Sequence, residues 1–203
     1  ARHAAAVDEH LAPAGKPSPA SPPRALISPH AGLMYSGPVA AHAYNAVRHA
    51  RYTSLVLVGP SHFVPFRGVS IWPGGSWETP IGAIQIDTGL PAAIAAESPE
   101  IIDLPEAHGR EHSLEMQLPF IAHLLRGVPI VPLVMGRQTR QTAFALGAAV
   151  ARAVGAHDGP VLLVASSDLS HYEDASTPAA LDGLNAAVLT VALFKVLRDR
   201  SGN

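Results

Sequence analysis

The chain of 203 residues contains no cysteine. This absence excludes a disulfide framework, zinc sites built from thiolates, and cysteine nucleophiles. Histidine, aspartate, glutamate and hydroxyl side chains are left to carry out any chemistry. Such nitrogen and oxygen donors favour hard or borderline metal ions over soft ones.

Charge is also scarce, since charged residues make up 15% of the chain and the formal net charge is only -2. No global field would attract nucleic acid or an anionic membrane, so we expect neither partner. The N-terminal region lacks a run of about 18 uncharged apolar residues. Together with 48% hydrophobic residues, these features are typical of one soluble globular domain, for which a cytoplasmic location is expected.

Histidine, by contrast, is abundant: the chain has 11 histidines. Several of them lie in polar or helix-end contexts and are expected to be solvated, namely His3, His10, His49 and His157. The informative histidines instead follow apolar runs.

Three apolar stretches each predict a short buried strand that ends in polar residues. They are Ala25–Ile27, followed by His30; Leu55–Val58, followed by His62; and Val161–Ala165, followed by Asp168 and His171. The carboxyl ends of neighbouring parallel strands face the ligand crevice of an open α/β sheet. If the three strands are neighbours, these polar residues converge there. For any single histidine, a simple hydrogen bond to a nearby loop stays open as the alternative.

Strand and helix patterns alternate along the chain, which predicts an α/β fold: a three-layer α/β/α sandwich with a mainly parallel central sheet in a single domain. A helix from about Pro38 to His49 is expected after the first strand, with Ser36 as its N-cap. The stretches Arg67–Trp72 and Ala83–Asp87 are predicted to pair as two strands and to form one wall of the pocket. Further predicted elements are a helix at Gly89–Glu97, a strand at Pro129–Met135 and a helix at Thr139–Val154.

Another helix is predicted to open at Glu111. Its buried stripe follows three- and four-residue spacing and consists of Leu114, Leu118, Ile121 and Leu125. Pro119 should either kink this helix or mark its true start. Acidic residues near a helix start also complement the macrodipole, an interpretation that suits Glu115 best.

Four motifs occur in order between Ser28 and Tyr172: SPHAGLMYSG, GPSHF, EHSLEMQLPF and SSDLSHY. Through them the chain resembles the Memo family, whose bacterial members are called AmmeMemoRadiSam system protein B. The resemblance implies a fold shared with class III extradiol dioxygenases, a pocket at the motif residues, and metal binding. It also implies association with an AMMECR-type protein and a radical-SAM protein. It does not extend to a defined reaction.

We interpret residues 1–203 as a single Memo-like domain that departs from the family at both ends. Family members carry a Phe-Tyr-Pro strand before the first helix, and that strand is absent here. After Tyr172 they continue through a longer helical region to a Cys-Gly motif, whereas here Asp182-Gly183 stands in its place. We therefore expect either a shortened loop or the absence of parts of the family's N- and C-terminal regions.

Two imidazoles from separate strand ends plus one oxygen donor form the ligand set of non-haem Fe(II) sites that keep positions open for substrate and oxygen. His30 and His62 are therefore predicted metal ligands. Fe(II) is the first candidate, Zn or Cu are alternatives, and a pocket without metal also stays open. In the relatives a carboxylate or the cysteine of the Cys-Gly motif supplies the third ligand, which implies Asp182. An ordinary turn residue before Gly183 is an equally open interpretation of Asp182.

The catalytic set predicted beside this metal consists of His112, Glu111, Asp168 and His171. His112 is the candidate general acid/base, because histidine ordinarily titrates at about pH 6.5. Asp168 is the other carboxylate that could serve as the third ligand, although on a strand-end loop it is expected instead to cap backbone N–H groups or to orient His171. Ser167, Asp168 and His171 are too close in sequence to form a Ser-His-Asp triad.

Two functions follow from these residues together with the resemblance to the Memo family. The first is a metal-dependent redox or dioxygenase-related enzyme that acts on a small polar or aromatic molecule in the pocket of His30 and His62. The second is a non-catalytic module that keeps the dioxygenase fold and binds a peptide or a partner protein. Ordinary ring cleavage of catechols is not expected, because only two protein ligands of the metal are firm.

Overall fold

Six strands form the central sheet of the computed structural model, which describes residues 2–15 and 21–168. Their order across the sheet is β1 (Ala25–Ser28), β8 (Val161–Ser166), β2 (Ser54–Pro60), β7 (Ile130–Met135), β3 (Val69–Ile71) and β6 (Ile101–Ile102). The first four strands are mutually parallel, whereas β3 runs antiparallel to β7 and β6 runs parallel to β3. The predicted mainly parallel sheet is confirmed.

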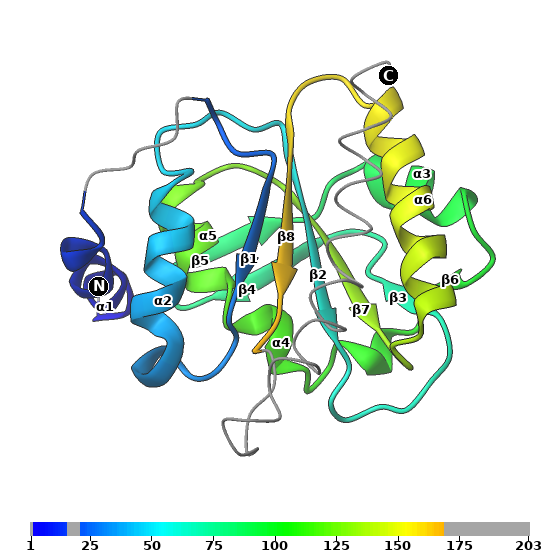
Figure 1. Ribbon diagram of the computed structural model, residues 1–203, viewed down its shortest axis with the longest axis horizontal. Coiled ribbons are helices and arrows are strands. Elements are labelled where there is room, and N and C mark those ends of the chain that lie inside the picture. Colours follow the sequence, from blue (N-terminus) through cyan, green and yellow to red (C-terminus); the bar gives the residue numbers. More distant parts are fainter. Residues whose placement is uncertain (1, 16–20, 169–203) are drawn as a thin grey trace.

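Helices cover both faces of this sheet (Figure 1). One face carries α1 (Arg2–Leu11), α2 (Leu33–Asn45), α4 (His112–Glu115) and α5 (Leu118–Leu124), and the other carries α3 (Leu90–Ala96) and α6 (Arg140–Ala156). Within residues 2–15 and 21–168, two 3-10 turns are the remaining helical elements, at Ala12–Ala14 and Pro105–Ala107. The three-layer arrangement expected from the alternating pattern is therefore present.

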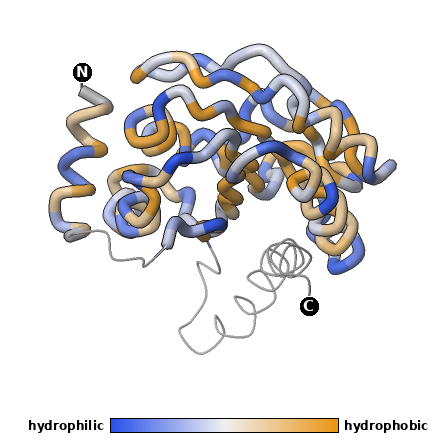
Figure 2. Tube along the Cα trace, turned by 90° about the horizontal axis from the view of Figure 1, so that it is seen from above, coloured by the Kyte–Doolittle hydropathy of each residue, from blue (hydrophilic) through white to orange (hydrophobic). Residues whose placement is uncertain are grey.

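The strands supply apolar side chains to both layers, because successive residues of a strand point to opposite faces. Leu55 and Leu57 pack with α2 and α5, whereas Val56 packs with α6. Hydrophobic segments accordingly run through the interior of the molecule (Figure 2). The first core also contains Tyr44 stacked on Phe120, with ring centroids 5.0 Å apart.

The predicted pairing of Arg67–Trp72 with Ala83–Asp87 is wrong. β3 instead joins the central sheet, and β4 (Ser76–Thr79) pairs with β5 (Gly82–Gln85) as a separate hairpin. The hairpin closes a short loop, which costs less chain entropy than the longer loop of the predicted pairing. Thr79 Oγ1 accepts hydrogen bonds from the N–H groups of Ile81 and Gly82 and so stabilises the turn.

The predicted boundaries of the second helix are also wrong. α2 begins at Leu33, so Pro38 lies inside it and Ser36 is not its N-cap. The Ser36 hydroxyl instead donates a hydrogen bond to the Ala31 carbonyl at 2.7 Å. Since Pro38 lies in the second turn, it removes a single backbone bond without ending the helix. Only Ala31 and Gly32 therefore separate His30 from the helix.

The helix predicted to open at Glu111 is two short helices in the structure, α4 and α5. Pro119 lies in the first turn of α5. Of the two predicted roles, it therefore marks a helix start and does not kink a longer helix. The stripe of Leu114, Leu118, Ile121 and Leu125 is buried as predicted.

No helix in the described ranges is long and apolar enough to cross a membrane.

Candidate functional site

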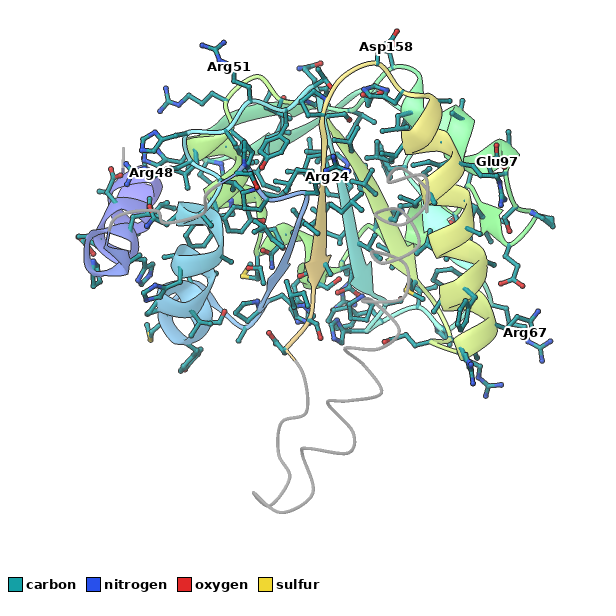
Figure 3. The ribbon with its side chains drawn as sticks, turned by 45° about the horizontal axis from the view of Figure 1, so that its top comes forward. Arg24, Arg48, Arg51, Arg67, Glu97 and Asp158 are labelled. Carbon is teal, nitrogen blue, oxygen red and sulfur yellow. The ribbon has the colours of Figure 1, made fainter. Side chains whose placement is uncertain are left out.

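The three strands that end in polar residues are neighbours, with β8 between β1 and β2. Their carboxyl ends lie together at the lower edge of the sheet in Figure 1. Arg67 lies toward the same end of the molecule, whereas Arg51 and Asp158 lie at the opposite end (Figure 3). His30, His62 and Asp168 each follow their strand by two residues and therefore meet at this edge.

Five of the predicted site residues gather here, and we call them the histidine cluster: His30, His62, Glu111, His112 and Asp168. The rings of His62 and His112 are stacked, with centroids 4.6 Å apart. The His30 ring lies edge-on to both, at 5.2 Å from His62 and 5.9 Å from His112. The other two predicted residues, His171 and Asp182, lie outside the described residues.

Close packing of α4 against β2 brings Glu111 and His112 to this edge. The Ser113 hydroxyl donates a hydrogen bond to the Pro60 carbonyl at 2.8 Å. A side chain at Gly59 would meet the Ser113 hydroxyl oxygen at 2.7 Å, so only glycine permits this approach. The strand end and the helix start are thereby held together without an intervening side chain.

Glu111 is the buried N-cap of α4 and holds His62. Its carboxylate accepts hydrogen bonds from the His62 backbone N–H at 2.6 Å, from His62 Nδ1 at 2.7 Å and from the Ser113 N–H at 2.8 Å. Burial by itself raises the pKa of Glu111, but these hydrogen bonds outweigh burial and leave the pKa below its ordinary value. A carboxylate can only accept, so His62 Nδ1 carries the proton and its Nε2 lone pair is free.

A second buried network begins at Gln117, which sequence reasoning left without a role. Its Nε2 donates to the Pro29 carbonyl and to Ser166 Oγ, both at 2.8 Å. Its Oε1 accepts a hydrogen bond from the Tyr44 hydroxyl at 3.1 Å. A flipped amide would place two oxygens against each other at Pro29, so these contacts fix the orientation of Gln117.

The hydrogens of this network also determine the tautomer of His30. Ser166 has one hydroxyl hydrogen, which it donates to the Ser113 carbonyl at 2.5 Å. One of its lone pairs accepts from Gln117, so the remaining lone pair must accept from His30 Nδ1, at 3.0 Å. His30 therefore carries its proton on Nδ1, and its Nε2 lone pair is free. Burial lowers the pKa of His30 from 6.5 to about 4, so the ring is neutral at neutral pH.

Asp168 caps the loop that carries His30. Its Oδ1 accepts hydrogen bonds from the backbone N–H groups of His30 and of Ala31, the latter at 2.7 Å. These contacts correspond to the backbone-capping interpretation of this residue. The other oxygen, Oδ2, lies 3.7 Å from His30 Nε2. Two acceptor atoms that face each other are stabilised by a positive charge between them.

Three residues of the cluster could hold a metal ion: ligand atoms of His62, Glu111 and His112 all lie within 4.8 Å of one another, a group that does not include His30. Neutral imidazole is the form that binds metal, and a ring whose Nδ1–H is held by a partner presents Nε2 in a fixed direction. Both His30 and His62 meet this condition, so Glu111 and Ser166 act as orienting partners of the two rings.

Gln117 and Ser166 are the site residues that sequence reasoning missed. Gln117 is a polar residue within the apolar stripe of its helix segment, three residues after Leu114 and four before Ile121. A polar side chain on a buried face needs partners, and this was the available signal. Ser166 is the first residue of the SSDLSHY motif, which is the signal that could have drawn attention to it.

His108 is a half-buried histidine whose backbone carbonyl accepts a hydrogen bond from the Glu111 N–H at 3.4 Å. Ser70 donates its hydroxyl hydrogen to the Leu104 carbonyl at 2.9 Å, so His108 Nε2, at 3.0 Å, must be the donor to Ser70. Among the described residues His108 Nδ1 has no hydrogen-bond partner, although it is buried. Burial lowers the pKa of His108 from 6.5 to about 4.

We expect His108 to make the protein less stable as the pH falls from 6.5 to 4. In this window the unfolded chain takes up a proton at this position and the folded chain does not, so protonation favours unfolding. The free energy of unfolding should fall by at most about 3 kcal/mol from this residue. Urea unfolding at pH 7 and pH 4 should show a smaller pH-dependent loss for His108→Gln than for the parent. Equal losses would contradict the prediction, since the contribution of His30 is common to both proteins.

In comparisons with known proteins, a family profile and individual relatives give the same family. A profile of the family described as Memo-like protein matches residues 3–190. A MEMO1 family protein of Caldivirga maquilingensis is 43% identical over 149 residues, which cover 73% of this chain and 53% of the relative. A MEMO1 family protein of Methanothermobacter thermautotrophicus is 44% identical over 161 residues, or 78% of this chain and 58% of the relative. A MEMO1 family protein of Thermotoga maritima is 37% identical over 181 residues, which cover 87% of this chain and 65% of the relative. The chain thus spans roughly half to two thirds of the length of these relatives.

Proposed function

We propose that this chain, which belongs to the family of Memo-like proteins, binds a divalent metal ion at the histidine cluster. We further propose that it acts there as a redox enzyme. The observation that carries the proposal is that the imidazole rings of His30 and His62 are both oriented by a hydrogen bond to Nδ1–H. His30 and His62 come from separate strands, and a buried partner holds the Nδ1–H of each, which leaves both Nε2 lone pairs free.

Fe(II) is the ion we propose first, with Zn(II) or Cu as alternatives, because the donors are nitrogen and oxygen and the chain has no thiolate. Two imidazoles and a carboxylate on Fe(II) leave positions at which a substrate and oxygen bind. The substrate class we propose is a small polar or aromatic molecule. The relationship to class III extradiol dioxygenases and membership of the AmmeMemoRadiSam system are part of this proposal.

His112 is the proposed general acid/base. Its side chain is 42% exposed, so it faces both the cluster and the solvent, and it stacks on His62. Its Nδ1 lies 3.8 Å from Glu111 Oε1, beyond hydrogen-bond distance, so Glu111 does not hold its proton. A ring in this position can deliver a proton to a bound substrate and recover it from water.

Elemental analysis of the purified protein and anaerobic titration with Fe(II) test the proposal. Binding of about one ion per chain, lost when His30 and His62 are both replaced, is the expected result. Absence of binding for Fe(II), Zn(II) and Cu alike would overturn it and favour the binding module.

The third ligand is expected to be either Asp168 or Asp182, and two isosteric variants separate them. Asp168→Asn keeps an oxygen that accepts from the His30 and Ala31 N–H groups but removes the charge. If Asp168 is the ligand, this variant should lower Fe(II) affinity by about tenfold or more, while Asp182→Asn should bind as the parent does. The reverse result would assign Asp182. Calorimetric titration under anaerobic conditions measures both, and parent-like binding by both variants would remove both aspartates from the ligand set.

A specific observation favours the second candidate function, a module that binds a peptide or protein. Met34 and Tyr35, just after the His30 loop, are 82% and 78% exposed. Exposed large apolar side chains that lie next to one another are common at protein-binding surfaces. The AMMECR-type and radical-SAM proteins are the partners proposed for this function. Co-purification that depends on Met34 and Tyr35, together with absence of metal, would support it over the enzyme.

A further inference from the structure

The region around Phe63 and Arg110, at the open side of the histidine cluster, has no role in the proposed metal site. Phe63 follows His62 directly and is 51% exposed. Its ring lies edge-on to His112, with centroids 5.8 Å apart. The Arg110 guanidinium carbon lies 5.4 Å from the centroid of the Phe63 ring. Guanidinium, phenyl and imidazole groups thus follow one another toward the cluster, each step under 6 Å.

Arg110 is available to an anion. In the described part of the chain no carboxylate forms an ion pair with it, although it directly precedes the buried Glu111. Stacking on Phe63 limits the freedom of its side chain, so less entropy is lost when it binds a partner. The planar guanidinium group forms paired hydrogen bonds with carboxylate or phosphate oxygens. An exposed arginine held in this way is suited to bind an anionic group.

The charge balance of the cluster indicates what charge a ligand near Arg110 should carry. Glu111 and Asp168 carry two negative charges at the histidines, so a divalent ion there would be nearly neutralised. Arg110, which stacks on Phe63, is then a permanent positive charge on this side of the site. A substrate without an anionic group would leave it unused.

We infer that the site binds aromatic acids, in which a ring packs against Phe63 and a carboxylate or phosphate group pairs with Arg110. The inference rests on the proposed function for the position of the reacting group, which would lie at His62 and His112. The half-exposed Phe63 supplies apolar contact for the ring. Arg110 and Phe63 are therefore assigned to specificity, not to metal binding.

NMR titration of the full chain at low ionic strength with benzoate, phenyl phosphate and neutral benzamide tests this assignment. The parent should bind the two anions at least about tenfold more tightly than benzamide. Arg110→Gln should reduce the difference to about twofold or less, whereas Phe63→Leu should weaken all three probes. A parent that binds benzamide as well as the anions, or an Arg110→Gln variant that still prefers them, overturns the assignment. If benzoate alone or phenyl phosphate alone is preferred, that result identifies which anionic group the substrate carries.

Two arginine variants serve as matched controls. Arg126→Gln changes an exposed arginine that follows α5 and lies beside β5, so it should bind all probes as the parent does. Arg67→Gln changes a different groove, of about 430 Å³, which Arg137 also lines. Loss of anion binding in Arg67→Gln instead of Arg110→Gln would place the anion in that groove and would contradict the assignment to Arg110.

Metal titration of the same variants separates this inference from the proposed function. Arg110→Gln and Phe63→Leu should bind Zn(II) with the affinity of the parent, since neither side chain is a proposed ligand. If the parent binds no metal but prefers the anionic probes through Arg110, the redox proposal fails and the anion site stands. If metal binds and the anion preference is absent, the proposed metal site stands and the aromatic-acid assignment fails.

Discussion

His62→Ala is expected to lower the affinity for Fe(II) or Zn(II) by more than about 100-fold. Loss of a group that merely orients a ligand typically costs 10- to 100-fold in metal affinity, so loss of the ligand itself should cost more. The Glu111 carboxylate would also lose its hydrogen bond from the imidazole, although the bonds from the two backbone N–H groups remain. His30→Ala should have a comparable effect, because the free Nε2 lone pair of His30 is the second proposed metal ligand.

His42→Ala is the matched control, since His42 is an exposed histidine of α2 outside the cluster. Anaerobic calorimetric titration of the three variants, with circular dichroism as a check on the fold, measures the effect. Parent-like affinity in a folded His62→Ala variant would show that the metal does not bind at the cluster.

The second large effect is expected for Gln117→Leu. Leucine has a similar volume but leaves the Pro29 carbonyl without its hydrogen bond from Gln117, the Tyr44 hydroxyl without its acceptor and Ser166 without one donor. Each buried polar group left unsatisfied costs about 1–3 kcal/mol, so the free energy of unfolding should fall by about 3–5 kcal/mol. Metal affinity should also fall by about 10-fold, because Ser166 would no longer be held in place against His30.

Urea unfolding monitored by circular dichroism measures the loss of stability. Gln138→Leu provides the control, because Gln138 is exposed in the loop before α6 and its replacement should change stability by less than about 0.5 kcal/mol. A loss below about 1 kcal/mol for Gln117→Leu would mean that the network contributes little. If the variant is too unstable for metal titration, Ser166→Ala tests the same link to His30 with a smaller change of volume.

Several features of the fold follow from short stretches of sequence. Apolar runs of three to seven residues indicated β1, β2, β7 and β8. For β2, β7 and β8 the reason is that a strand buried on both faces needs no polar side chains, whereas Ile27 of the edge strand β1 is 45% exposed. The spacing of Leu114, Leu118, Ile121 and Leu125 identified one buried face. Alternation of strands and helices was sufficient for the three-layer class, since parallel strands require crossover connections.

The errors arose where competing local structures differ little in energy. A helix start three residues after His30 and one at Pro38 are both compatible with the residues between them. Proline is tolerated within an early turn, and the Ala31 carbonyl gave the Ser36 hydroxyl another partner. Likewise, β-strand propensity alone could not show whether Val69–Ile71 pairs with the hairpin or with β7. That choice depends on the completed sheet, where β3 buries both faces.

The sequence by itself determined which chemistry is available: no thiolate, and histidines or carboxylates after apolar strands. Those features are local, because a strand, its end and the residue that follows lie within one short window. The tertiary structure alone decided that β8 lies between β1 and β2, and that Ser166 therefore contacts His30. The three bonds that orient His30 through Ser166, Gln117 and Tyr44 join residues 136, 49 and 73 positions apart. Contacts across such separations depend on how whole elements pack, and no periodicity within a segment encodes them.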